Sequence, residues 1–118
     1  MKTTDAKSSS GILAAGNPQA HGHYKHMREA LGNADALDQK TYETVIAVQF
    51  AMLGKEVQFK IHAIRLFSLG LSKEYVQAVV LAGLGLTVIM CDAARSLMWT
   101  DEAYDEFLAR SSVMIAEV

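Results

Sequence analysis

The chain contains little cysteine, little proline and little charge. Its 118 residues include one cysteine, Cys91, and one proline, Pro18, and 20% of the residues are charged. A single cysteine excludes an intramolecular disulfide, and it excludes a thiol pair that cycles between redox states. Turn dipeptides are scarce and no segment alternates at a period of two, which argues against a β-sheet. The absences therefore favour an all-α protein.

Positive charge is also sparse. Eleven Lys and Arg stand against thirteen Asp and Glu, giving a net charge of −2. The cations form no basic stripe and do not alternate with the four Tyr and four Phe. A basic stripe and aromatic residues among the cations are typical of nucleic-acid-binding proteins, and this chain lacks both, so we expect no nucleic-acid partner.

No segment has the character of a targeting sequence or a membrane anchor. Residues 1–10 contain an acidic residue and lack an apolar core, so the sequence predicts neither a signal peptide nor an anchor and favours a cytoplasmic protein. The longest uncharged stretch, residues 75–91, is 17 residues long, at the lower edge of the length that spans a bilayer. We expect a buried helix pair there and no membrane partner.

Apolar residues, by contrast, make up 51% of the chain. A small domain keeps a large fraction of its surface, so this content exceeds what one copy needs for its own core and predicts self-association. The length suits a single domain, and no internal repeat divides it. We predict a flexible tail over residues 1–16 and one helical domain over residues 17–118.

Capping residues and glycines divide this domain into helices. Pro18 suits a first helical turn, Asp38 and Ser72 suit N-caps, and Gly54 and Gly70 suit the residue that follows a helix. A further break is expected near Gly83 and Gly85, and Thr100-Asp101-Glu102 is expected to cap a last helix. The six predicted helices cover residues 17–31, 39–53, 55–69, 73 to about 82, a segment ending at 99, and 100–115.

Cys91 ends the apolar run Leu86-Thr87-Val88-Ile89-Met90. Free cysteine behaves as a small hydrophobe, and apolar burial disfavours the reactive thiolate. We therefore expect a buried, unreactive thiol.

A carboxylate and an imidazole stand at matching positions on either side of Gly54. Glu43 lies eleven residues before this glycine and His62 eight residues after it. At 1.5 Å per helical residue, the two lie roughly 16 Å and 12 Å from the turn of a helical hairpin. They are candidates for a general acid/base pair facing each other across two packed helices.

The same residues resemble the carboxymuconolactone decarboxylase and alkylhydroperoxidase D-like family. Leu37-Asp38-Gln39-Lys40-Thr41-Tyr42-Glu43 resembles the family's segment Leu-Asp-x-Lys-Thr-x-Glu, His62 falls on its histidine, and Gly70-Leu71-Ser72 resembles its Gly-x-Ser/Thr. The two family cysteines are replaced by Lys55 and Gln58. The resemblance covers about residues 24–108. It implies an alkylhydroperoxidase D-like helical bundle without a cofactor, assembled as a homotrimer or homohexamer.

Three functions follow from this resemblance. In the first, the protein is a lyase that performs acid/base chemistry on a small carboxylated lactone or keto acid. His62 would move the proton, and Glu43 would orient the His62 ring. Lys55, Gln58 and Arg65 share a polar stripe with His62 and are the candidate substrate-binding residues. The alternative is an oligomeric or small-ligand-binding protein without catalysis. Hydroperoxide reduction is the least favoured, because its thiolate nucleophile is missing.

His21, His23 and His26 form a second group of candidate ligands. His23 and His26 share a helical face, but Gly22 weakens the local helix and no Cys or carboxylate lies nearby in sequence. We expect an exposed polar face here and no metal site.

Overall fold

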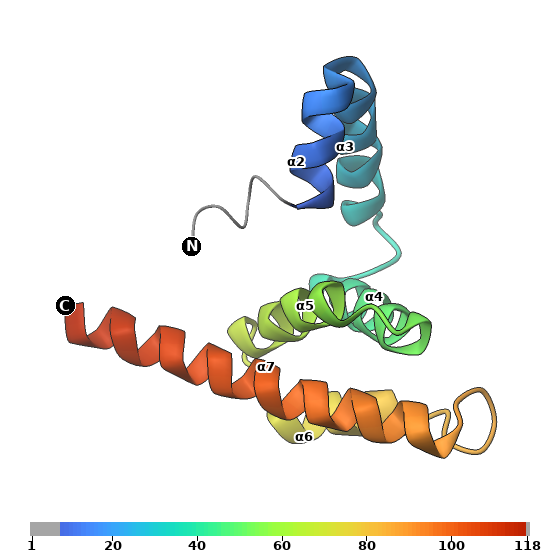
Figure 1. Ribbon diagram of the computed structural model, residues 1–118, viewed down its shortest axis with the longest axis vertical. Helices are drawn as coiled ribbons and strands as arrows, with labels where there is room; N and C mark the ends of the chain where they lie inside the picture. The colour runs from blue at the N-terminus through green and yellow to red at the C-terminus, as the bar shows by residue number, and fades with distance from the viewer. Residues whose placement is uncertain (1–7, 118) are drawn as a thin grey trace. The chain divides into compact units, whose positions relative to one another are not determined.

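The computed structural model describes residues 8–117, and this part of the chain is helical throughout, with turns and loops between the helices (Figure 1). An isolated bridge between Leu84 and Val88 is its nearest approach to a strand. The all-α prediction is confirmed. The helices are α2 (Ser9–Gly16), α3 (Pro18–Gly32), α4 (Gln39–Leu53), α5 (Glu56–Ser68), α6 (Lys73–Leu81) and α7 (Met90–Glu117).

The chain divides into two compact units after Leu37. The first contains α2 and α3, and the second contains α4 to α7. The domain predicted over residues 17–118 is therefore divided, because α3 groups with α2. Each unit is described below by itself.

In the first unit, α2 and α3 form a helical hairpin with a capping side chain at each start. The hydroxyl of Ser8 accepts from Gly11 N at 3.0 Å, and Asn17 Oδ1 accepts from Ala20 N at 3.0 Å. The tail predicted over residues 1–16 is thus wrong for residues 9–16, which are helical, while residues 1–7 lie outside the described part. The overlooked signal is local, since Ser8 is a favourable N-cap before the apolar residues of α2.

In the second unit, α4 packs on α5, while α5 and α6 pack on α7 (Figure 1). Asp38 begins α4 by accepting from Thr41 N at 2.7 Å, and this bond to the backbone lowers the pKa of the Asp38 carboxyl. Gly54 ends α4 in the left-handed conformation, with φ of 72°. The bounds of α4 match the predicted 39–53, because both ends are fixed by local signals.

The core of this unit is built by α4 to α7, and α4 contributes the small buried residues Ala47 and Ala51. The largest fully buried side chains come from α5, α6 and α7: Phe59, Leu66, Val76 and Thr100. At one side of this core, the ring of Phe67 meets that of Tyr104 edge-on, with centroids 5.1 Å apart. Such a contact adds about 0.5–1.5 kcal/mol to the free energy gained by burying the rings.

The two helices predicted to meet at Thr100 are one continuous helix, α7, of 28 residues. Thr100 does not cap a new helix. It is fully buried, and its hydroxyl donates to the Ser96 carbonyl at 2.8 Å, inside the helix. Ser96 does the same to Asp92 at 3.0 Å. A threonine can bond to the backbone in this way within a helix or at its start, so the motif alone did not distinguish the two.

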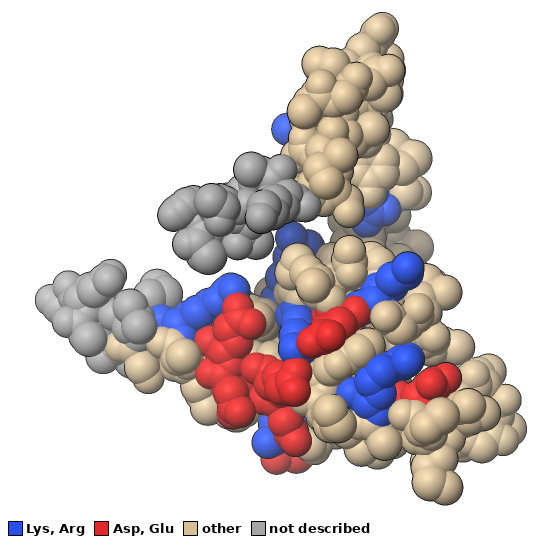
Figure 2. All heavy atoms as spheres, in the orientation of Figure 1, with Lys and Arg blue, Asp and Glu red and all other residues tan. Residues whose placement is uncertain are grey.

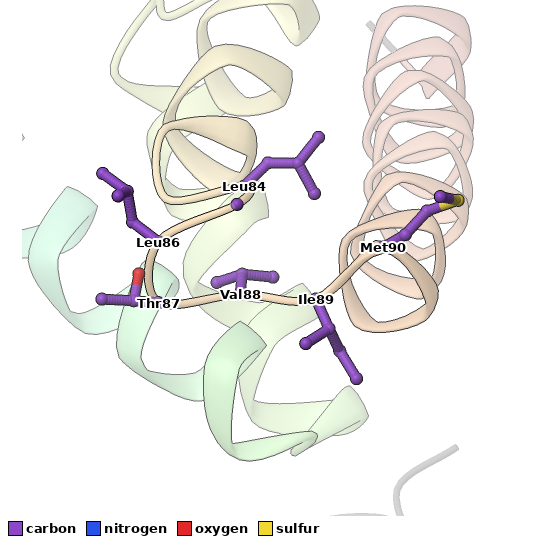
Figure 3. Close-up of a pocket in the computed structure, with 7 residues that line it drawn as sticks. Leu84, Leu86, Thr87, Val88, Ile89 and Met90 are labelled. Carbon is purple, nitrogen blue, oxygen red and sulfur yellow. The ribbon is translucent and has the colours of Figure 1, made fainter.

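The buried helix pair predicted over residues 75–91 is also wrong. Helix α6 ends at Leu81, and residues 82–89 form a loop that lines a shallow, largely apolar pocket (Figure 3). Leu84, Leu86 and Ile89 of this loop are exposed, and Val88 is half-buried. Leu86 is 89% exposed, and Cys91, predicted to be buried, is exposed at the start of α7. Among the described residues, no helix combines the length and the apolar character needed to cross a bilayer.

Candidate functional site

The turn between α4 and α5 sets the register of the candidate site. Gly54 N bonds to Ala51 O at 3.2 Å, and Lys55 N bonds to Phe50 O at 3.0 Å. These bonds satisfy the last carbonyls of α4 while the chain reverses within two residues. The reversal places residues equally far from the turn side by side on the two helices.

Glu43 and His62 are in contact across this hairpin. His62 Nδ1 lies 2.6 Å from Glu43 Oε1. The Glu43 side chain is 5% exposed and that of His62 is 15% exposed, so the contact is shielded from water. The pairing predicted from the spacing is confirmed as geometry, and the catalytic roles of the two residues stay a prediction.

The second carboxylate oxygen of Glu43 is held as well. Gln39 Nε2 donates to Oε2 at 3.3 Å, and Arg65 Nη1 lies 3.8 Å from the same oxygen. Burying a carboxylate is costly unless it is paired and hydrogen-bonded. These three neighbours explain how a nearly apolar helix accommodates Glu43.

The imidazole of His62 is fixed by two different contacts. Its ring stacks on Phe50, with centroids 5.5 Å apart and the planes at 30°. Because an ionised carboxylate only accepts hydrogen bonds, the contact with Glu43 places a hydrogen on Nδ1. In the neutral ring, Nε2 then carries the lone pair, and it forms no hydrogen bond to another described residue.

The three predicted substrate-binding residues have different environments. Arg65 joins the Glu43 pair while its side chain stays 57% exposed. Lys55 is exposed at the N-cap of α5, and Gln58 is half-buried one turn before His62. The structure therefore brings Glu43, His62 and Arg65 together, and among the described residues it gives Lys55 and Gln58 no hydrogen bond or ion pair with them.

Sequence reasoning missed Gln39 and Phe50. Both lie on the face of α4 that carries Glu43, at four residues before it and seven after it. That helical spacing was an available signal. Phe50 is one of many apolar residues of this helix, and Gln39 entered the prediction only as part of the segment from Leu37 to Glu43.

Lys60 forms a second polar cluster that the sequence did not indicate. Its ammonium lies 2.7 Å from Glu56 and 2.5 Å from Glu102, which ties α5 to α7. Partial burial lowers the pKa of Lys60, but the hydrogen bonds to Glu102 and Glu56 outweigh it, and the net pKa is raised. Acidic side chains gather over α7 on the visible face, with basic side chains beside them (Figure 2).

The histidines of α3 do not converge. His21 Nε2 bonds to the Ser10 hydroxyl at 2.8 Å, whereas His23 and His26 are exposed. In the described part of the chain, no group of three His, Cys, Asp or Glu side chains is placed to hold a metal ion.

Comparisons with known protein families, curated proteins and solved structures found no match.

Proposed function

We propose that Glu43 and His62 form an acid/base site that transfers protons to and from a small carboxylated substrate. The observation that carries the proposal is the 2.6 Å contact between Glu43 and His62 Nδ1, which leaves Nε2 without a partner among the described residues. A carboxylate bonded to one imidazole nitrogen selects the tautomer and stabilises the protonated ring. Nε2 is the atom that exchanges the proton.

The chemistry that fits is decarboxylation of a carboxylated lactone or keto acid. The bond between the substrate carbon and its carboxylate breaks, and the electron pair enters the neighbouring unsaturated system as an enolate. Protonated His62 then gives its Nε2 proton to the carbon, and solvent restores the proton. Glu43 stabilises the imidazolium during this cycle, and no oxidant or thiol takes part.

Arg65 is the candidate anchor for the substrate carboxylate. Its guanidinium is 57% exposed and reaches Glu43 only at 3.8 Å, so part of its hydrogen-bonding capacity faces solvent. Exposed Lys55 adds positive charge to the same helix. The proposal also retains the resemblance to the carboxymuconolactone decarboxylase family, a homotrimeric or homohexameric assembly and a cytoplasmic location.

The test is carbon dioxide release in D₂O from acetoacetate, oxaloacetate and a γ-lactone that bears a carboxylate, with deuterium in the product followed by NMR. We expect turnover above the buffer rate with at least one of them. His62→Gln should lower it about 10²–10⁴-fold, the usual contribution of a general acid/base. His26→Gln, on an exposed histidine of α3, is the matched control and should leave the rate unchanged.

One observation favours a second function, ligand binding without catalysis. Both oxygens of Glu43 are already held by neighbouring side chains, as in a polar contact that serves the fold. In this case acetoacetate shifts the ring resonances of His62 in a saturable way while no carbon dioxide is released. Absence of both turnover and saturable shifts with all three compounds would reject an anion site at this pair.

A further inference from the structure

The charges of the candidate site cancel when the imidazole is neutral. Glu43 carries a negative charge, Arg65 carries a positive charge, and Gln39, which donates to Glu43 Oε2, carries none. The Glu43 side chain is 5% exposed and that of His62 is 15% exposed, so water screens these groups weakly. In such surroundings an unbalanced charge is costly, and a charge added at one group changes the protonation of its neighbours.

Arg65 is the charged member of the site that faces solvent. Its side chain is 57% exposed, and its Nη1 lies 3.8 Å from Glu43 Oε2, which is longer than a hydrogen bond. A guanidinium carries five N–H donors, so donors remain for a second carboxylate that arrives from solvent. The Gln39 amide, 3.3 Å from the same Glu43 oxygen, keeps that oxygen hydrogen-bonded when the guanidinium turns to a ligand.

The charged side chains that connect α5 and α6 to α7 are engaged elsewhere. They form ion pairs of their own, Lys60 with Glu102 and Lys73 with Asp101. Among the described residues, none of α6 or α7 forms an ion pair or a hydrogen bond with Glu43, His62 or Arg65. The charge balance of the site is therefore set by side chains of α4 and α5.

We infer that Arg65 couples the binding of a substrate carboxylate to the protonation of His62, which rests on the acid/base function proposed above. A carboxylate bound at Arg65 leaves the site with one excess negative charge, and one proton taken from solvent onto the imidazole cancels it. Because Nδ1 is held by Glu43, the proton enters at Nε2. Decarboxylation consumes this proton, since hydrogen replaces the carboxylate on the substrate carbon when carbon dioxide leaves.

The coupling is reciprocal. If a bound carboxylate favours the protonated ring, the protonated ring favours the bound carboxylate by the same factor. The His62 ring is thus protonated to a larger fraction in the occupied site than in the empty site. The acid is present when a substrate can use it. Coupling between two binding events usually changes affinity by about 5- to 150-fold.

The first experiment measures the binding of oxamate, a small inert carboxylate, by titration calorimetry. The range is about pH 6 to pH 8, over which a histidine ring ordinarily changes charge. In wild type the dissociation constant should rise by about 5- to 150-fold with pH, and buffers of different ionisation enthalpy should reveal net proton uptake on binding. In His62→Gln the affinity should be nearly independent of pH.

Arg65→Gln tests whether this side chain carries the coupling. Without the guanidinium, Glu43 is unbalanced in the empty site. The His62 ring should then be protonated to a larger fraction than in wild type at the same pH, as read from its NMR ring resonances. Oxamate should bind more weakly and without proton uptake. The matched control is Arg110→Gln on α7, an arginine that is 61% exposed and pairs with Glu106, and it should behave as wild type.

The outcomes separate this coupling from the proposed reaction. Oxamate binding that depends on pH in wild type and not in Arg65→Gln would support the coupling, even if none of the three test compounds released carbon dioxide. Carbon dioxide release with pH-independent oxamate binding would overturn the coupling and retain the reaction. Absence of saturable oxamate binding would also overturn it, as would a protonated fraction of His62 that Arg65→Gln leaves unchanged in the empty protein.

Discussion

Two of the glycine-containing connections of the second unit, α4–α5 and α6–α7, have opposite character. The α4–α5 turn consists of Gly54 and Lys55, and its backbone groups bond to the end of α4. The α6–α7 connection runs over residues 82–89, contains Gly85 at φ of 88°, and bonds mainly to itself, with Gly85 N on Val88 O at 3.0 Å. A glycine thus marks where the chain turns, whereas the surrounding contacts decide whether the turn is enclosed.

The enclosing contact at the first turn is Arg95 of α7. Its guanidinium would lie 3.3 Å from a Cβ added at Gly54, and it donates to Ala51 O at 3.5 Å. In the second connection, a Cβ added at Gly85 would meet no atom within 4 Å, and the atoms close to Gly83 belong to Thr87 and Val88 of the same loop. The enclosed hairpin can therefore hold a carboxylate and an imidazole in a fixed relation, and the open loop exposes apolar side chains.

The strongest test of the enclosed region removes the contact that spans it. His62→Ala should lower the free energy of unfolding by about 2–3 kcal/mol, because it leaves Glu43 buried with weaker partners. Glu43→Gln should cost a similar amount. Urea denaturation of both single variants and the double variant should give a coupling energy of about 0.5–3 kcal/mol.

The control for this cycle is Gln49→Ala, an exposed position on α4, which should stay within about 0.5 kcal/mol of wild type. Losses that simply add in the double variant would show that the carboxylate and the imidazole do not stabilise each other.

The two glycines permit a matched comparison of the connections. Gly54→Ala should cost about 1–2 kcal/mol, since alanine is disfavoured at positive φ and its Cβ would crowd Arg95. Gly85→Ala carries only the backbone cost and should be the milder change. Thermal unfolding of both variants, alone and with Arg95→Met, separates the two causes. If the difference persists without Arg95, crowding by that guanidinium is not its source.

A smaller effect is expected on the stability of the protein at low pH. The Asp38 pKa is lowered in the folded protein by its bond to Thr41 N, so its contribution to stability is present above the unfolded pKa of about 3.9. That contribution is lost as the pH falls through the lower, folded-state pKa. Asp38→Asn keeps a capping oxygen that does not titrate in this range, and it should flatten the fall in urea midpoint between pH 5 and pH 2.

Ser72, which caps α6 by accepting from Tyr75 N at 3.0 Å, is a cap without a titrating group. Ser72→Ala should lower the urea midpoint equally at both pH values. A similar slope for Asp38→Asn and wild type would mean that this carboxyl contributes nothing to the acid sensitivity.

The smallest effect is expected at the start of α7, next to the open connection. Cys91→Ser should change the free energy of unfolding by less than about 0.5 kcal/mol, because the side chain is exposed. In the native protein one thiol per chain should react with a disulfide reagent without denaturant, and no thiol-dependent hydroperoxide turnover should be seen. A thiol that reacts only in urea would show that this region is covered in solution.

The enclosed region was the more predictable of the two for a physical reason. Asp38 and Gly54 act through bonds to residues three or four positions away, so the bounds of α4 follow from local sequence. The distances of Glu43 and His62 from the turn then follow from helix geometry alone. Their chemical role does not, because it depends on what binds beside them.

The incorrect predictions concern residues whose local sequence fits two structures, so that burial in the folded protein decides between them. Thr100 suits an N-cap or a helix interior, and its position in the core of the second unit selects the interior. Cys91 follows an apolar run, and such runs are usually buried, but here the run belongs to a loop that packs on little. No local signal distinguishes these outcomes, since both depend on contacts between helices that are distant in sequence.

The placement of Arg95 beside Trp99 makes tryptophan fluorescence sensitive to the position of the α4–α5 turn. Its guanidinium lies 4.9 Å from the ring centroid of Trp99, the single tryptophan, while the same group contacts the α4–α5 turn. Indole emission responds to a nearby cation, so a change in the spacing between α7 and this turn alters the fluorescence. The opening of the hairpin can thus be followed by tryptophan emission in the unlabelled protein.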